Sequence, residues 1–288
     1  MNGGIEDPFG LRPLWDALLE VYRAYADICR KHGLRHYVAF GTLLGAVRHR
    51  GFIPWDDDFD VLMPRPDYER FVEFAARELP QHFRFVNWHN TPEFKLLFGK
   101  IQDSRRGKVE SIERRIGHQL SNGIFIDVFP IDGYPTSCVG KVAEKFLGVL
   151  RMSYFRFLTR RSRPPAKTLL GKVSTMVGGI VSPLYLFKGT SSLMKSAEEV
   201  VLSRCFSPFR VSAVTGNRVG SYESVYPSGV FEDVKMVPFD SVMVPIPVGV
   251  ETLLRLSYGD YMQLPPVECR RPSHEYGDRC PWWLGPTV

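Results

Sequence analysis

Cysteine is scarce in this chain of 288 residues, and its few copies show no structural pattern. The five cysteines lie far apart, have no C-x-x-C spacing and are odd in number. This distribution argues against a zinc site or a disulfide framework and favours a reducing compartment. The amino terminus also lacks the basic and apolar regions of a signal peptide. We therefore expect a cytoplasmic protein, with the inner face of the membrane as an alternative location.

The sequence also lacks an uninterrupted apolar run long enough to span a bilayer, which takes about twenty residues. Its most apolar stretch, residues 169–187, is interrupted by Lys172, several glycines and Pro183. A buried helix explains this stretch better than a spanning one. Peripheral contact with a membrane stays open as an alternative, because the preceding residues 160–167 are basic.

Internal repeats, low-complexity linkers and basic stripes with interleaved aromatic residues are all missing. The formal net charge of +6 is only mildly basic, and hydrophobic residues make up 44% of the chain. These values describe an ordinary globular protein and suit an anionic substrate such as a nucleotide. We expect no nucleic-acid partner, since no recognisable binding module is present.

Helix-like and strand-like segments alternate over the first 135 residues, which predicts an α+β fold with a mixed sheet flanked by helices. The sequence predicts three domains or lobes: a catalytic core over 1–135, a helical insertion over 136–229 and, over 230–288, strands, a short helix and a tail that complete the core. Within the core, we expect helices over 11–31, 42–49 and 67–79. The expected strands cover 36–40, 58–63, 83–88, 94–103 and 123–130.

An acidic run stands at the start of one predicted strand. Asp56, Asp57, Asp58 and Asp60 fall within five residues and lead directly into Val-Leu-Met. Alternation along a strand would project Asp58 and Asp60 from one face, with Asp56 behind them and Asp57 pointing away. Ionised carboxylates held side by side repel one another unless a divalent cation lies between them. The alternative is an acidic turn whose carboxylates face water.

Two further segments complete a candidate site around these carboxylates. Gly41-Thr42 ends a predicted strand and opens a helix, with Thr42 able to cap it, and phosphate binds readily at such a helix amino terminus. Asp127 interrupts an apolar strand pattern, where a carboxylate is costly unless it is paired or bound to metal. Arg48 and Lys100 are our candidates for holding phosphate charge. Burial of Asp127 against an arginine or backbone amides, and surface ion pairs for the two cations, remain as alternatives. We expect Asp132 in a turn or a cap.

The run from Gly41 to Asp60, GTLLGAVRHRGFIPWDDDFD, resembles the signature of the LicD family of phosphotransferases, which includes fukutin and the fukutin-related protein. The block FIDVFPIDG, residues 125–133, resembles the second motif of that family. The segment YGDYMQLPP, residues 258–266, with His274 shortly after it, resembles the carboxy-terminal signature. The three motifs cover most of the chain in the expected order.

The resemblance implies a nucleotidyltransferase-like fold in which Asp58, Asp60 and Asp127 are catalytic and hold Mg²⁺, with Mn²⁺ as an alternative. It implies transfer of phosphocholine, or of a related phospho-alcohol, from a CDP-activated donor to a hydroxyl of a cell-surface glycan. The acceptors in the family are lipopolysaccharide, teichoic acid or capsule, and CDP-choline is the first candidate donor. The expected substrate-binding residues are Gly41, Thr42, Trp55, Arg48, Lys100 and His274.

Two other functions stay open at this point. The same fold would serve nucleotidyl transfer from an NTP, with pyrophosphate as the leaving group instead of CMP. Alternatively, the chain is a non-catalytic protein that binds a glycan or a membrane and keeps its metal site for structural reasons. The retention of Asp58, Asp60 and Asp127 together argues against this last function.

Overall fold

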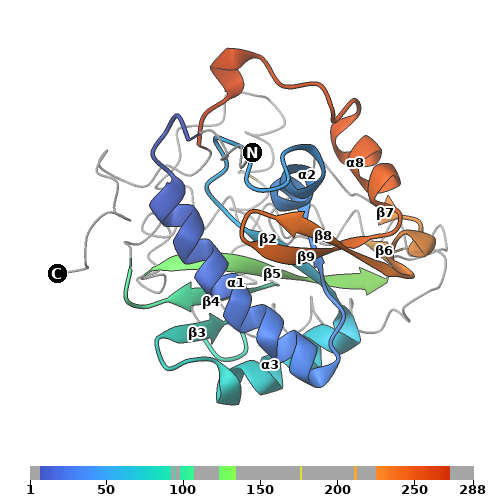
Figure 1. Cartoon of the computed structure of the whole chain (residues 1–288). Coiled ribbons are helices and arrows are strands. Elements are labelled where there is room, and N and C mark those ends of the chain that lie inside the picture. Colours follow the sequence, from blue (N-terminus) through green and yellow to red (C-terminus); the bar gives the residue numbers. More distant parts are fainter. Residues whose placement is uncertain are drawn as a thin grey trace.

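The computed structural model describes residues 7–91, 94, 98–106, 123–133, 176, 211–212 and 225–272. A mixed sheet forms the centre of the molecule, with the strand order β1-β2-β5-β4-β3 (Figure 1). The central pair β2 and β5 is parallel, and the other neighbours on this path are antiparallel. The strands are β1 (Tyr37–Val38), β2 (Asp60–Pro64), β3 (Phe83–Val86), β4 (Gly99–Asp103) and β5 (Ile124–Gly133). Two short strands, β6 (Val211–Ser212) and β7 (Val225–Tyr226), extend the sheet beside the end of β5.

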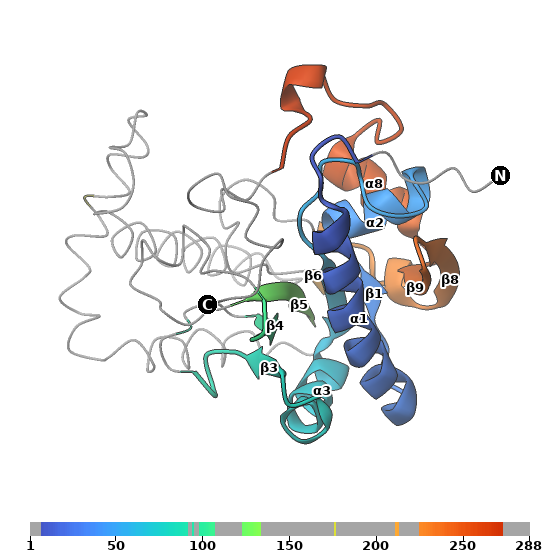
Figure 2. The ribbon, with the colours of Figure 1, turned by 60° about the vertical axis from the view of Figure 1, so that its left-hand side comes forward.

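Two helices, α1 (Arg12–His32) and α3 (Arg65–Glu78), lie together on one face of the sheet (Figures 1 and 2). The apolar residues of α1 recur at helical spacing, and this stripe is buried against the sheet. Gly33 ends α1 in the left-handed conformation, with φ 61°, and its N–H returns to the last carbonyls of the helix. The core therefore lies between the α1–α3 layer and the sheet.

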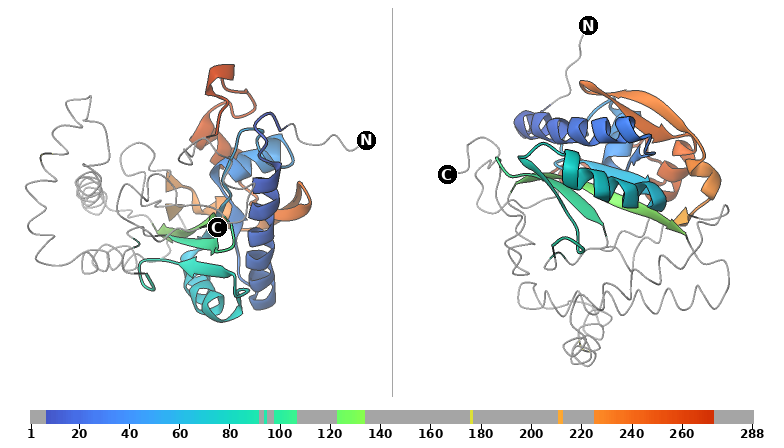
Figure 3. Two further views of the ribbon diagram at one scale, coloured as in Figure 1. Left: turned by 90° about the vertical axis from the view of Figure 1, so that its left-hand side faces the viewer. Right: turned by 90° about the horizontal axis from the view of Figure 1, so that it is seen from below.

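The carboxy-terminal part adds a hairpin and a helix to this core. It consists of a 3₁₀ turn η1 (Ser228–Phe231), strands β8 (Val234–Phe239) and β9 (Val242–Pro247), helix α8 (Val250–Tyr258) and a 3₁₀ turn η2 (Val267–Cys269). The β8–β9 hairpin lies beside α1 on the side away from α3 (Figure 3, right). Val230, Val244 and Leu253 belong to the same buried cluster as the apolar residues of α1 and β2.

The α+β class with a mixed sheet is confirmed, but several element boundaries differ from those predicted. The first strand covers only Tyr37–Val38, because Phe40 already begins helix α2 (Phe40–Arg48). The strand expected over 94–103 begins at Gly99, and the helix expected over 67–79 begins at Arg65. Most of the predicted helical insertion, residues 136–229, lies outside the described residues, and the three domain boundaries remain predictions.

Asp132 is not a turn or cap residue, as the sequence predicted, but lies buried inside β5. Its carboxylate accepts two hydrogen bonds from Arg65, from Nε at 2.6 Å and from Nη2 at 2.7 Å. Such a bidentate pair satisfies both oxygens of a buried carboxylate, which would otherwise be costly. The ion pair therefore joins the start of α3 to the end of β5.

Candidate active site

Three of the predicted site residues form a row across the central strands. Asp60 on β2 is the register partner of Asp127 on β5, and Asp127 is in turn the register partner of Lys100 on β4. Register partners on adjacent strands project from the same face of a sheet. The Lys100 Nζ lies 3.1 Å from Asp127 Oδ1, and the Lys100 side chain is only 5% exposed. The sheet itself therefore places two carboxylates and one ammonium side by side.

The backbone of Asp60 is fixed on both sides. Its N–H donates to Thr42 Oγ1 at 2.9 Å, and its carbonyl accepts from the N–H of Ala39 at 3.0 Å. Thr42 is thus not the cap of its helix, as predicted, because α2 begins two residues earlier and Ala39 occupies the cap position. Its hydroxyl instead ties the first turn of α2 to the start of β2.

The remaining carboxylates of the acidic run gather just before β2. Carboxylate oxygens of Asp56, Asp57 and Asp58 lie within 4.8 Å of one another. Asp57 belongs to this group and is only 1% exposed, so the prediction that it points away from the other carboxylates is wrong. The alternation that predicted this applies only to a regular strand, and β2 begins at Asp60. Residues 56–59 form irregular backbone, which lets consecutive side chains converge.

Asp56 is positioned by two residues that the sequence did not connect with it. The indole Nε1 of Trp15, on α1, donates to the Asp56 carbonyl at 2.8 Å. At Gly41, a Cβ atom would lie 2.6 Å from Asp56 Oδ2, so only glycine leaves this carboxylate its place. We expected Gly41 to admit a ligand, and the structure shows that the room beside it accommodates Asp56. No sequence pattern pointed to Trp15.

These carboxylates repel one another in the absence of a cation. Burial raises the pKa of Asp60 well above its usual range, and the charges of Asp58, Asp127 and Asp56 raise it further. The positive charge of Lys100 lowers the pKa of Asp60. A divalent cation relieves such repulsion by interacting with several oxygens at once. The carboxylate oxygens of Asp58, Asp60 and Asp127 are therefore ligands of the kind that Mg²⁺ and Mn²⁺ prefer.

Lys100 is held by a ring as well as by a carboxylate. Its Nζ lies 3.4 Å from the ring centroid of Phe125, which precedes Asp127 by two residues on β5. A buried ammonium needs such partners, because desolvation otherwise disfavours its charged form. The role of Lys100 in binding phosphate stays a prediction, and in the structure its ammonium contacts Asp127.

The first turn of α2 lies beside this carboxylate group. Its first intrahelical hydrogen bond runs from the N–H of Leu43 to the carbonyl of Ala39, so the N–H groups before Leu43 have no acceptor within the helix. Phe40, the first helical residue, has a positive φ of 44°, an unfavourable conformation for a residue with a Cβ. Gly41 and Thr42 therefore lie where a helix amino terminus attracts a phosphate.

Arg48 and Trp55 connect this region to the carboxy-terminal segment. Arg48 Nη1 donates to the carbonyl of Tyr261 at 2.8 Å, so that α2 contacts the predicted third motif. Trp55 is half-buried, and the guanidinium of Arg270 lies 5.7 Å from its ring centroid. Among the predicted substrate-binding residues, His274 lies outside the described residues.

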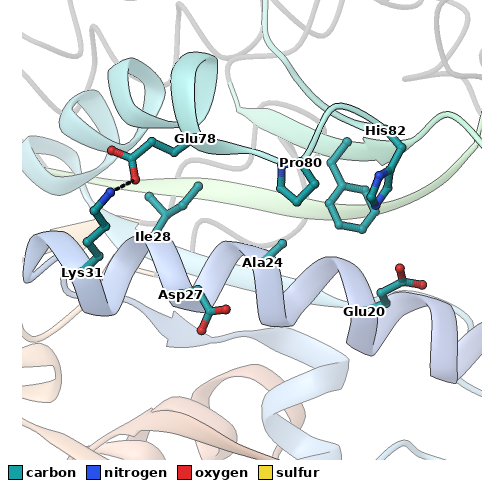
Figure 4. A pocket seen from close by; sticks show the side chains of 9 residues that line it. Glu20, Ala24, Asp27, Ile28, Lys31, Glu78, Pro80 and His82 are labelled. Carbon is teal, nitrogen blue, oxygen red and sulfur yellow. Dashed lines mark hydrogen bonds and ion pairs between the residues drawn. The ribbon is translucent and has the colours of Figure 1, made fainter.

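A shallow groove of about 390 Å³ opens elsewhere, between α1 and the segment from α3 to β3 (Figure 4). Lys31 and Glu78 form an ion pair across it at 2.9 Å. Glu20, Asp27 and His82 also line it, but none of the site carboxylates does. This groove is therefore separate from the candidate site.

The mixed sheet, its carboxylates on β2 and β5 and the helix that follows β1 define a nucleotidyltransferase-like α+β protein. Residues 33–142 match the family model described as LicD/FKTN/FKRP, nucleotidyltransferase domain. The matched residues include the first two of the three motifs, so this part of the chain is similar to the LicD family, as those motifs predicted.

The similarity to one relative extends beyond this domain. The chain is 28% identical over 260 residues to the lipopolysaccharide cholinephosphotransferase LicD of Haemophilus influenzae, covering 89% of this chain and 92% of that protein. An uncharacterized protein of Rickettsia typhi is 35% identical over 65 residues, covering 23% of this chain and 20% of its own. In the part of the chain that the structure describes, no helix is both long and apolar enough to cross a membrane.

Proposed function

We propose that this chain transfers phosphocholine, or a closely related phospho-alcohol, from a CDP-activated donor to a hydroxyl group of a surface glycan. The observation that carries the proposal is the row of Asp60, Asp127 and Lys100 across the sheet, with Asp58 beside it. The similarity to the Haemophilus enzyme over nearly the full length of both chains supports the phosphocholine group and lipopolysaccharide as the acceptor. Teichoic acid and capsule are further acceptors to test.

Asp58, Asp60 and Asp127 would hold Mg²⁺ or Mn²⁺ in this proposal. When bound, the metal would offset negative charge on the phosphate oxygens and lower the pKa of the acceptor hydroxyl. The ammonium of Lys100 also offsets part of the negative charge at the site, because it lies against Asp127. The N–H groups at the start of α2 would orient the donor phosphates, with Gly41 and Thr42 nearest to the carboxylates.

The overall transfer balances without any further reactant. An oxygen of the acceptor forms a bond to the phosphorus of the phosphocholine group, and the bond from that phosphorus to the bridging oxygen of CDP-choline breaks. The hydroxyl proton is released, and CMP leaves. Trp55, half-buried beside Arg270, is our candidate for contact with the donor, since an aromatic face suits a quaternary ammonium.

The direct test is an assay of the purified full chain with CDP-choline, lipopolysaccharide and Mg²⁺. We expect CMP release coupled to phosphocholine on the glycan, and at least about a hundredfold loss in Asp60→Asn and Asp127→Asn. Asp16→Asn is the matched control, because Asp16 is exposed on α1 and should leave the rate unchanged. Pyrophosphate release from an NTP instead of CMP release would assign the chain to nucleotidyl transfer. Full activity of both active-site variants would refute the proposed metal role.

A further inference from the structure

A second groove, of about 610 Å³, lies between α1 and the β8–β9 hairpin, on the opposite flank of α1 from the groove of Figure 4. We call it the basic groove, since Arg23, Arg30 and Arg35 line it and Asp27 is its single acidic residue. Arg23 and Arg30 are exposed residues on α1. Arg23 donates to the neutral hydroxyl of Ser241, so this contact leaves its positive charge uncompensated. Arg30 pairs with Asp27 at 2.7 Å, and Arg35 pairs with Asp67, outside the lining, at 3.5 Å. Three guanidinium groups thus stand against two carboxylates, which leaves one positive charge in excess.

The hairpin side of the basic groove is apolar and unusually exposed. Met236 on β8 and Met243 on β9 line it, and each is 51% exposed. Pro245, the register partner of Met236, belongs to the same lining but is itself buried, as are Val244 and Ile246. Methionine side chains are flexible and polarisable, and they adapt to irregular apolar partners. Exposed methionines beside an arginine cluster form an amphipathic surface.

A partner that adds a strand does not suit this surface. Addition of a strand requires backbone N–H groups at the edge of a sheet. Proline provides none, and β8 contains Pro238 while β9 contains Pro245 and Pro247. The positive charge and the exposed apolar side chains instead match an anionic headgroup above acyl chains.

We propose that the basic groove and the outer face of the hairpin bind the surface of a bilayer that contains anionic phospholipid. A lipid phosphate would lie among Arg23, Arg30 and Arg35, and Met236 and Met243 would enter the acyl region. This placement differs from the membrane contact that the sequence suggested for residues 169–187. It concerns binding alone, so it holds or fails separately from the proposed transfer reaction.

The first experiment is sedimentation of the full chain with vesicles, without donor or acceptor. We expect binding to vesicles of phosphatidylcholine with phosphatidylglycerol and much weaker binding to phosphatidylcholine alone. The double variant Arg23→Gln/Arg30→Gln should bind the anionic vesicles about thirtyfold more weakly. The matched control, Arg77→Gln/Arg255→Gln, removes the same charge from exposed positions on α3 and α8 and should lose much less. Equal losses in the two variants, or no binding by the native chain, would overturn the proposal.

A second measurement locates the contact without depending on charge. In Met236→Trp, the fluorescence emission of the added indole is obtained by subtracting the spectrum of the native chain. This emission should shift to shorter wavelengths when anionic vesicles are added, and brominated acyl chains should quench it. Met262→Trp provides the control, because Met262 is 57% exposed and lies outside the basic groove. Vesicle binding without quenching of the indole at position 236 would place the contact elsewhere and exclude this surface.

Discussion

Asp60 and Asp127 are register partners in a parallel strand pair, so two carboxylates stand side by side on neighbouring central strands. Asp60 is 7% exposed, and its pKa is raised by burial and by three neighbouring carboxylates. Without a cation this arrangement destabilises the folded chain, because the charged form of Asp60 is disfavoured there. The cost is fully present above the raised folded-state pKa of Asp60 and disappears as the pH falls toward 3.8.

We predict that Asp60→Asn stabilises the metal-free chain while it removes activity. At neutral pH in EDTA, its melting temperature should exceed that of the native chain by about 2–4 °C. Addition of Mg²⁺ should raise the melting temperature of the native chain more than that of the variant, since a ligand stabilises the state that binds it. A variant that melts below the native chain in EDTA would contradict this account.

Gly41 and Gly45 offer a matched pair of substitutions with different expected outcomes. In Gly41→Ala, the added Cβ would lie 2.6 Å from the Asp56 carboxylate, a side chain that is able to move. We expect a large loss of transferase activity with little change in melting temperature.

In Gly45→Ala, the added Cβ would lie 2.4 Å from the backbone carbonyl oxygen of Gly51, which the fold holds in place. We expect this variant to lose stability, by roughly 1–3 kcal/mol, as overpacked cores do. Thermal unfolding and CMP release, measured on both variants, separate the two effects. The reverse pattern would show that Gly41 matters for packing rather than for the site.

The ion pair between Arg65 and Asp132 should matter for stability rather than for chemistry. The two side chains are 11% and 4% exposed, so removing one partner leaves a buried charge without its counter-ion. We expect Arg65→Met to cost about 3–5 kcal/mol in the free energy of unfolding. Arg65→Met/Asp132→Leu should recover part of that loss in denaturant titration. If the double variant is no more stable than the single one, the penalty has another source.

His36 predicts how stability changes at mildly acidic pH. Burial lowers its pKa from 6.5 to about 4 in the folded chain, because the ring packs edge-on against Tyr25 and its Nε2 atom is shielded from water. Unfolding exposes the ring, which then binds a proton below pH 6.5. Stability should therefore be lost as the pH falls from about 6.5 to 4, by up to about 3 kcal/mol.

His36→Phe should remove this part of the pH dependence, since phenylalanine keeps an aromatic ring but does not titrate. Denaturant unfolding of both proteins between pH 7.5 and 4.5 would measure it. His82→Phe serves as the control, because His82 lies at the edge of β3 outside this buried cluster. An unchanged slope in His36→Phe would assign the pH dependence to other groups.

The sequence predicted the site residues through a motif, and it predicted their grouping through the expected strands. Asp60 and Asp127 interrupt apolar strand patterns, so each was recognisable as a costly carboxylate. Their adjacency depends on the pairing of β2 with β5, which the sequence order alone does not state. The α+β class followed from alternating periodicities, which depend only on local residues.

The predictions near the site were wrong where contacts between residues distant in the sequence override the preferences of the local sequence. Strand alternation was applied to Asp57 although β2 begins three residues later. Thr42 has the composition of a cap, but its hydroxyl accepts from Asp60, a residue 18 positions away. The link from Trp15 to Asp56 spans 41 positions and leaves no pattern in the sequence.

The parallel pairing of β2 with β5 also has a consequence for how the protein folds. Asp60 and Asp127 are 67 positions apart, and the chain passes through α3, β3 and β4 before the two meet. Closing so long a loop is slow, so contacts of this kind form late in folding. A nascent chain that ends before residue 127 cannot assemble the carboxylate group. Metal binding that depends on Asp127 would therefore appear during synthesis only once β2 has paired with β5.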